Sequence, residues 1–289
     1  MATLTWDESG KRFYETGVDK GVLYIPNAFG VYNNGVAWNG LTSITESPTG
    51  AEPSAMYADN IKYLNLYSAE EFGATLEAYT YPDEFAQFDG LATPFTGITV
   101  GQQSRKKFGL SYRTRLGNDV DGDDYGYKLH LIYGCQASPS ERAYNTINDS
   151  PEAITFSWEI ATTPVSVTNY KTTSILTVDS TKVNATALTN LNNLLYGTAG
   201  TDPSLPLPDA VLALFSGTAV SVTPTIPTYN STTKVITIPA VTGVTYYRNG
   251  TALAAGSLTI TVNTIITASP NVGYFFPAGI DDDWFFSFA

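Results

Sequence analysis

Hydrophobic and polar residues alternate along much of the chain, which is the pattern of strands that bury one face. The clearest alternation covers residues 107–115, and a second covers residues 125–133 after the turn-like stretch 117–124. A turn symmetric about residues 120 and 121 places Leu110 opposite Leu131 and brings the two apolar faces together. We therefore predict an antiparallel hairpin in this register, because a slip of one residue would mix the faces.

The same register fixes where the basic side chains of the hairpin lie. Arg113 falls opposite Lys128, with Arg115 and His130 on the same side. Like charges that face each other destabilise a strand pair. This face therefore needs acidic partners, from this chain or from a neighbouring one, or it is an ordinary solvated face.

Other segments before residue 216 also have strand patterns, with few helical signals among them. Strands are expected near residues 18–25, 36–46, 60–68, 73–80, 153–160 and 173–179. In the segment 153–160, Trp158 faces the apolar side and Glu159 the polar side. An amphipathic helix is expected over residues 183–195, capped by Ser180 or Thr181 and stopped by Gly197, with a short helix following at 209–215.

The composition changes after residue 215. No acidic residue occurs between Asp209 and Asp281, and residues 216–224 are rich in small residues and proline. The remaining strands are short, at residues 234–238, 244–247, 257–267, 274–276 and 284–288, with Asn249-Gly250 as a tight-hairpin signal. We expect a mainly β fold: a β-sandwich or barrel with one flanking helix (1–215), a linker (216–224) and a small immunoglobulin-like sandwich (225–289).

Candidate catalytic and metal-binding residues are few. The single Cys135 excludes an internal disulfide, and the single His130 excludes a two-histidine metal motif. Phosphate-binding loops and nucleophile elbows are absent from the sequence. Asp119, Asp121 and Asp123 have the spacing that begins a calcium loop, but Asp124 and His130 occupy positions that need glycine and glutamate. We expect no enzyme activity, no cofactor and no metal, with an exposed acidic hairpin tip at residues 119–124.

Charge and hydropathy limit the partners. The 289 residues carry 15 basic and 27 acidic side chains, a formal net charge of −12. An acidic surface repels phosphate, so tight binding of nucleic acid by counterion release is not expected. No apolar run is long enough to span a membrane, and the first residues lack a secretory-signal pattern. We therefore expect no membrane insertion and no export.

Several segments of residues 1–215 together resemble a known family. They are residues 5–25, 35–54, 58–66, 79–85, 109–114, 149–153 and 205–215. In these segments the chain resembles the major tail proteins of long-tailed, non-contractile bacteriophages of the siphovirus type. The end of the chain is similar to the immunoglobulin-like extensions that some of these proteins carry.

The resemblance implies a structural role in the virion. It implies assembly in the host cytoplasm as hexameric rings that stack into a hollow tube around the tape-measure protein. It also implies contacts with tail-terminator and baseplate or distal tail proteins, and DNA that passes through without specific binding. A β-rich adhesin or carbohydrate-binding protein is the alternative, favoured by 19 tyrosines, 4 tryptophans and the appended sandwich. A glycoside hydrolase is a third hypothesis.

Three sets of residues are candidates for this role. The long stretch 46–60 joins two predicted strands and matches the stacking loop of the family, with Glu46, Pro48, Glu52, Met56 and Tyr57 as its contact residues. A basic strip at a subunit interface consists of Arg105, Arg113, Arg115 and Lys128. Glu77 and Glu159, each on the polar side of a strand, are the candidate acids of the tube lumen.

Overall fold

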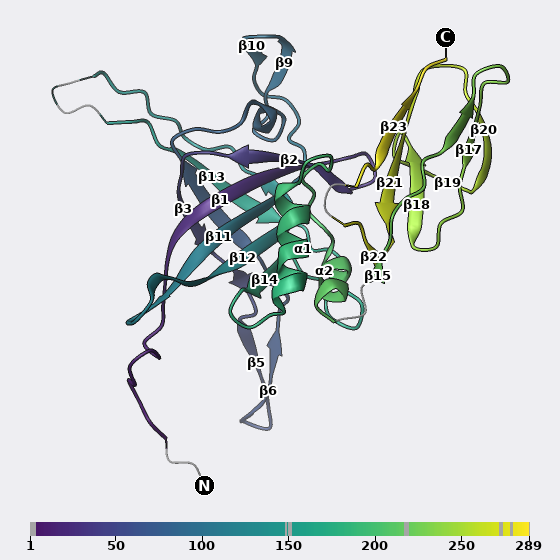
Figure 1. The fold of residues 1–289 in the computed structure, drawn as a ribbon. Coiled ribbons are helices and arrows are strands. Elements are labelled where there is room, and N and C mark those ends of the chain that lie inside the picture. The colour runs from purple at the N-terminus through teal and green to yellow at the C-terminus, as the bar shows by residue number, and fades with distance from the viewer. Residues whose placement is uncertain are drawn as a thin grey trace. The chain divides into compact units, whose positions relative to one another are not determined.

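The computed structural model is mainly β, with two α-helices and one 3-10 helix in the described residues (Figure 1). It describes residues 4–147, 149, 152–216, 220–271, 274–277 and 280–288. The chain divides into two compact units. The first contains Met1–Leu23, Ala37–Val165 and Thr172–Thr177, and the second contains Tyr24–Val36, Ser166–Lys171 and Val178–Ala289.

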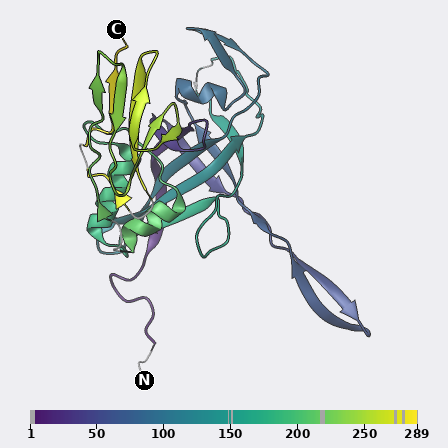
Figure 2. The same ribbon diagram turned by 90° about the vertical axis from the view of Figure 1, so that its right-hand side faces the viewer.

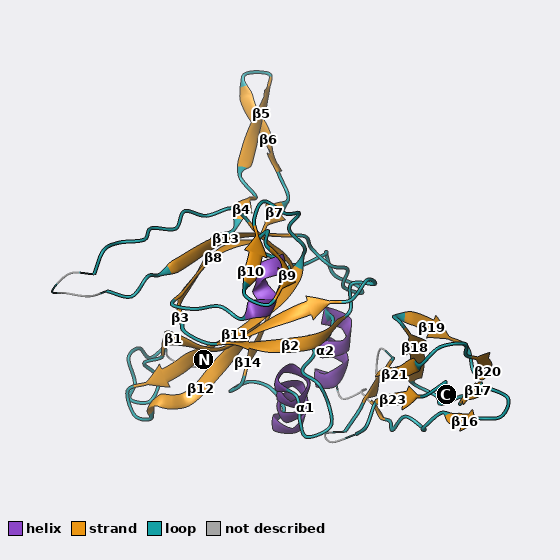
Figure 3. Ribbon diagram, turned by 90° about the horizontal axis from the view of Figure 1, so that it is seen from above, coloured by secondary structure: helices purple, strands orange, loops and turns teal. Residues whose placement is uncertain are grey.

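One sheet of eight strands contains most strands of the first unit, together with Tyr32–Val36 of the second. Its order is β2 (Tyr32–Trp38), β1 (Tyr14–Pro26), β11 (Phe108–Asn118), β12 (Gly122–Ala137), β13 (Phe156–Thr162), β8 (Gly73–Ala78) and β3 (Leu41–Glu46), with β14 (Ile175–Asp179) also paired to β12. The two end strands, β2 and β3, are joined by only two residues, which reach about 10 Å. The sheet must therefore curl until its ends approach each other, which makes it a barrel, as Figure 3 shows.

Aromatic side chains fill the inside of this barrel. Trp158 pairs with Leu76 across β13 and β8, and both are fully buried. The ring of Phe85, from the 3-10 helix η1 (Asp83–Gln87), lies 5.1 Å from Trp158 and 4.6 Å from Trp38. Glu159 is exposed, so the two faces predicted for this strand are confirmed.

The predicted register of the hairpin β11–β12 is wrong by one residue. Leu110 pairs with Ile132 and Tyr112 with His130, because the ladder shifts at both of its ends. Residues 108–112 and 129–135 are buried on both faces of the sheet. Because neither face is solvated here, the alternation of side chains does not select a register.

The stretch 46–60 is also different from the prediction, because it is not an irregular loop. It is the outgoing half of a long hairpin between β3 and β8, which we call the arm (residues 47–72). The arm has a neck, β4 (Thr49–Gly50) paired with β7 (Glu70–Glu71), and a blade, β5 (Pro53–Ala58) paired with β6 (Ile61–Tyr67). Figure 2 shows the blade projecting far from the other strands. A shorter hairpin, β9 (Ala92–Phe95) with β10 (Ile98–Val100), also projects.

Two helices belong to the second unit. Helix α1 (Ala185–Tyr196) is capped by Asn184, whose side chain accepts hydrogen bonds from the backbone N–H groups of Thr186 and Ala187. The expected cap, Ser180 or Thr181, is therefore wrong, because Asn184 lies directly before the first turn. Helix α2 (Pro208–Phe215) lies where the short helix was predicted.

The C-terminal strands form two small sheets around one apolar core. One sheet contains β16 (Thr228–Asn230), β17 (Val235–Ile238) and β20 (Gly256–Thr259). The other contains β19 (Thr251–Leu253), β18 (Val244–Arg248), β21 (Thr264–Pro270) and β23 (Asp283–Phe286), while β15 (Val220–Ser221) pairs with β22 (Tyr274–Phe275). Ile236, Ile266 and Trp284 are among the buried residues that the two larger sheets share.

The structure confirms one prediction for the C-terminal strands and contradicts another. The Asn249-Gly250 hairpin is confirmed, since β18 and β19 pair directly around it. The single strand expected at 257–267 is wrong, because it breaks into β20 and β21, which belong to different sheets. Residues 217–219 of the expected linker lie outside the described residues, and the division at 216–224 stays a prediction.

Candidate assembly surfaces

The blade of the arm is covered with exposed apolar side chains. Seven of them are between 38% and 71% exposed, namely Met56, Tyr57, Ile61, Tyr63, Leu64, Leu66 and Tyr67. Met56 pairs with Leu64, so both lie on one face of the blade, while Tyr67 pairs with Pro53 on the other. Both faces of this two-stranded ribbon are therefore apolar and open to solvent.

The neck brings its two strands into very close contact. Gly50 has φ +83°, and a Cβ there would collide with the carbonyl oxygen of Ala69. Only glycine fits both the left-handed backbone and this approach. Pro48 and Glu52, predicted contact residues of the stacking loop, flank this point and are exposed. The neck thus joins the blade to the barrel through one pair of strands with only two residue pairs.

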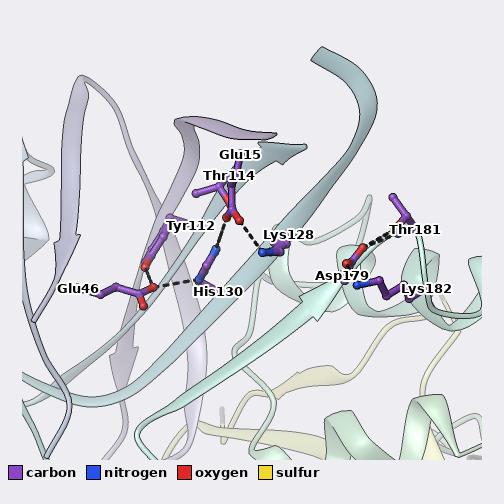
Figure 4. A network of polar contacts seen from close by, with 9 residues as sticks. All are labelled: Glu15, Glu46, Tyr112, Thr114, Lys128, His130, Asp179, Thr181 and Lys182. Atoms are coloured by element: carbon purple, nitrogen blue, oxygen red, sulfur yellow. Dashed lines mark hydrogen bonds and ion pairs between the residues drawn. The ribbon is translucent and has the colours of Figure 1, made fainter. Parts of the chain in front are cut away.

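Glu46 lies at the root of the arm, as the last residue of β3. Its partner across the ladder is Ala74, so its side chain lies on the inner face of the barrel with Leu76. There it accepts a hydrogen bond of 2.5 Å from the Tyr112 hydroxyl, and it lies 3.1 Å from Nδ1 of His130 (Figure 4). Glu46 was predicted as a loop residue that contacts another subunit, but the structure gives it partners within the barrel.

His130 links Glu46 to a second acid, Glu15 of β1. Its Nε2 lies 3.0 Å from the Thr114 hydroxyl and 3.7 Å from Glu15, and Glu15 also pairs with Lys128. Although burial raises it, hydrogen bonds from Lys128 and Thr114 hold the pKa of Glu15 below its ordinary value. We call Glu15, Glu46, Tyr112, Thr114, Lys128 and His130 the polar cluster.

The four residues of the basic strip do not lie on one surface. Arg113 and Arg115 both contact Asp19, at 2.6 and 3.3 Å, whereas Lys128 contacts Glu15 inside the barrel. Lys128 pairs with Thr114 and not with Arg113, so the side chains of Arg113 and Lys128 lie on opposite faces of the hairpin. Arg105 lies apart from all of them and pairs with Asp89 at 3.1 Å.

Strand β1 supplies acids to both faces of the hairpin. Glu15 and Asp19 are four residues apart and would share one face of a regular strand. Between them Gly17 has φ +66°, a left-handed backbone that breaks the alternation. The hydrogen bond from Arg113 is the main cause that keeps the pKa of Asp19 below its ordinary value. Sequence reasoning missed these two acids, because no local pattern shows which strand will pair with β11.

The two candidate lumen acids share one polar face of the barrel. Glu77 pairs with Ser157, and Glu159 pairs with Thr75, on the face opposite Trp158. Ser43 of β3 also donates a hydrogen bond of 2.9 Å to Glu77. The strands β3, β8 and β13 contain no basic residue. This face therefore combines two carboxylates with hydroxyl groups and carries no cation of its own.

The acidic turn at residues 119–124 holds the N-terminal segment. Asp119 accepts hydrogen bonds from the backbone N–H groups of Gly10 and Arg12, at 3.0 and 3.3 Å. Asp123 accepts a hydrogen bond of 2.8 Å from the Tyr14 hydroxyl. In the described part of the chain, no group of three or more His, Cys, Asp and Glu side chains is arranged to hold a metal ion.

Two further findings concern the lone cysteine and the membrane. Cys135 is fully buried, and burial raises the pKa of its thiol, which keeps it protonated and unreactive.

Among the described residues, neither helix has the length and apolar character needed to cross a membrane.

Comparisons with known proteins give distant structural likenesses. No protein-family model and no curated protein matches the sequence. A chain of the anti-feeding prophage baseplate, determined by cryo-EM, is similar over 63% of this chain and 100% of its own, with 12% identity and a TM-score of 0.31. A chain of the PVC sheath–tube complex, an extracellular contractile injection system in its extended state, is similar over 60% and 93%, with 11% identity and a TM-score of 0.27. Both TM-scores lie below 0.5, so these likenesses leave the function of this chain open.

Proposed function

We propose that this chain is the structural subunit of a phage tail tube of the long-tailed, non-contractile type, which assembles as hexameric rings that stack. The proposal starts from the sequence resemblance over residues 1–215. The exposed apolar side chains on the blade of the arm are the second support for the proposal. A two-stranded hairpin is marginally stable alone in water, and large exposed apolar patches mark surfaces that associate. A second copy of this chain, in the next ring, is the proposed partner of the blade.

The chemistry of the blade suits such a contact. Tyrosines and a methionine dominate it, and these are residue types enriched at protein interfaces. The arm also carries four acids, Glu52, Asp59, Glu70 and Glu71, against the single Lys62. We therefore expect the receiving surface of the next subunit to be apolar with a basic margin.

The polar face with Glu77 and Glu159 is the proposed inner wall. Duplex DNA carries one phosphate charge per about 1.7 Å of its axis, so a basic wall would hold it and an acidic wall would let it pass. Six chains of net charge −12 each would give a ring a charge of −72. The tape-measure protein, the tail-terminator and baseplate or distal tail proteins are the further proposed partners. The place of action would be the virion, after assembly in the host cytoplasm.

Negative-stain electron microscopy of the purified protein tests this function. We expect hollow filaments or rings for the wild type. A variant in which residues 51–69 are replaced by an Asn-Gly turn should keep its fold and form no filaments. A matched control replaces residues 93–99, which make up most of the hairpin β9–β10, in the same way and should still form filaments.

The other outcomes identify the alternatives. A wild type that stays monomeric at every concentration, and binds sugars on a glycan array, would overturn the tube in favour of a carbohydrate-binding protein. Release of reducing sugars from polysaccharide would instead indicate a hydrolase.

A further inference from the structure

We propose that Tyr112 and His130 are positioning residues for the arm, which hold Glu46 and thereby set the direction in which the blade projects. The inference rests on the proposed function only where it concerns assembly. Its structural part concerns the single subunit and can be tested there.

The neck by itself gives the blade little orientation. It contributes two residue pairs, Thr49 with Glu71 and Gly50 with Glu70. Ala51, directly after it, has φ +55°, so the backbone bends before the blade begins. The direction of the blade therefore depends on how firmly the root, at Glu46 and Gly73, is fixed to the barrel.

The root is fixed to the ladder on one side and to the barrel interior on the other. Ser47 donates a backbone hydrogen bond of 2.8 Å to Gly73, and the Thr162 hydroxyl donates one of 2.6 Å to Phe72. The side chain of Glu46 reaches further. In the sheet order, β8 and β13 separate β3 from β12, so its contact with His130 crosses the inside of the barrel.

The two groups that hold Glu46 are themselves rigid. Tyr112 and His130 are 2% and 8% exposed, and their rings stack with centroids 4.6 Å apart and planes 5° apart. Thr114 contacts the far side of the imidazole ring at 3.0 Å. Rotamers that are locked by packing and by a second layer of hydrogen bonds hold a partner in one geometry. Glu46 is 38% exposed in its side chain and would otherwise move freely.

The direct test measures the arm in the unassembled subunit. Cys135 is buried, so cysteines introduced at Ala58, at the end of the blade, and at Ala161, exposed on β13, can be spin-labelled selectively. We expect a narrow distance distribution between the two labels. Tyr112→Phe keeps the ring stack and removes only the hydroxyl, and should broaden this distribution. The same variant should slow filament formation about tenfold, since a hydrogen bond to a charged group is lost.

A matched control separates positioning from a general loss of stability. Tyr14→Phe removes another tyrosine hydroxyl bound to a carboxylate, that of Asp123 at the start of β12. It should leave the distance distribution and the rate of filament formation unchanged. Glu46→Ala, at a partly exposed position, gives a second test that does not disturb the buried rings, and it should broaden the distribution as well.

The outcomes distinguish this inference from the proposed function. An unchanged distribution in both Tyr112→Phe and Glu46→Ala would overturn the positioning role, whether or not filaments form. A broadened distribution in a protein that never forms filaments would support the positioning role and contradict the tube.

Discussion

Arg113 donates hydrogen bonds to both carboxylate oxygens of Asp19, from Nε at 2.6 Å and from Nη2 at 2.7 Å. Arg115 contacts the same carboxylate at 3.3 Å, but from a side chain that is 49% exposed, against 18% for Arg113. The two arginines thus share one acid and differ in burial. The bidentate pair fastens β1 to β11 within the subunit, so Arg113 of the predicted basic strip has a stabilising role in the chain itself.

Charge reversal should separate the two arginines. Arg113→Glu places a second negative charge beside the partly buried carboxylate of Asp19 and should lower the free energy of unfolding by about 2 kcal/mol. Arg115→Glu makes the same chemical change at an exposed position and should cost less than about 1 kcal/mol. Urea unfolding of both variants measures this. Equal losses would contradict the assigned role of the bidentate pair.

His130 should titrate below its ordinary pKa. Burial is the main cause that lowers the pKa of His130, with Lys128 acting in the same direction, and Glu46 and Glu15 oppose them. As the pH falls, the unfolded chain therefore protonates its histidine at a higher pH than the folded chain does. The stabilisation that comes from a neutral His130 is complete above about pH 6.5, and it is lost as the pH falls through the lower pKa of the folded state. Because the chain has one histidine, a single imidazole resonance in NMR reports the titration, and a midpoint above 6.5 would contradict it.

Asp282 should make the protein less stable at neutral pH than at mildly acidic pH. Burial, followed by Asp283, Asp202 and Asp281, raises the pKa of Asp282 to about 6. The stabilisation that comes from a protonated Asp282 is complete below its ordinary pKa of 3.8, and it is lost as the pH rises through about 6. Asp282→Asn should therefore raise the free energy of unfolding at pH 8 by about 1 kcal/mol, after allowance for solvent screening.

A second variant and a second pH provide the control for Asp282. The gain should shrink at pH 4, where the wild-type carboxyl is already protonated in the folded state. Asp283→Asn, at an exposed neighbour, should give a smaller gain at pH 8. Thermal unfolding of the three proteins measures both differences, and an equal gain from the two variants would count against burial as the cause.

Sequence reasoning succeeded where one face of an element is buried and the other is solvated. The alternation of Trp158 and Glu159 fixed both faces of β13 correctly, because only one arrangement buries the apolar set. It failed for β11 and β12, where both faces are covered and Tyr112 and His130 lie side by side. The predicted alternation there treated His130 as part of a polar face, yet it is 8% exposed.

The stacking role of residues 46–60 stays a prediction. Met56 and Tyr57, named as its contact residues, are exposed in the structure, but the regular pairing of the arm was missed, since Pro48, Gly50 and Pro53 indicated a loop. Pro53 is tolerated because it is the first residue of its strand. Partners such as Asp19 could not be predicted, because they depend on strand pairings between residues about a hundred positions apart.

The arm leaves and re-enters the barrel between two strands that are already paired with each other, β3 and β8. Lengthening or shortening it therefore changes no strand order and no core contact. Each doubling of such an excursion adds only about 0.6 kcal/mol of closure entropy. The reach of the arm is for this reason a property that mutation can adjust independently of the barrel, so spacers of different length could be tried on one unchanged scaffold.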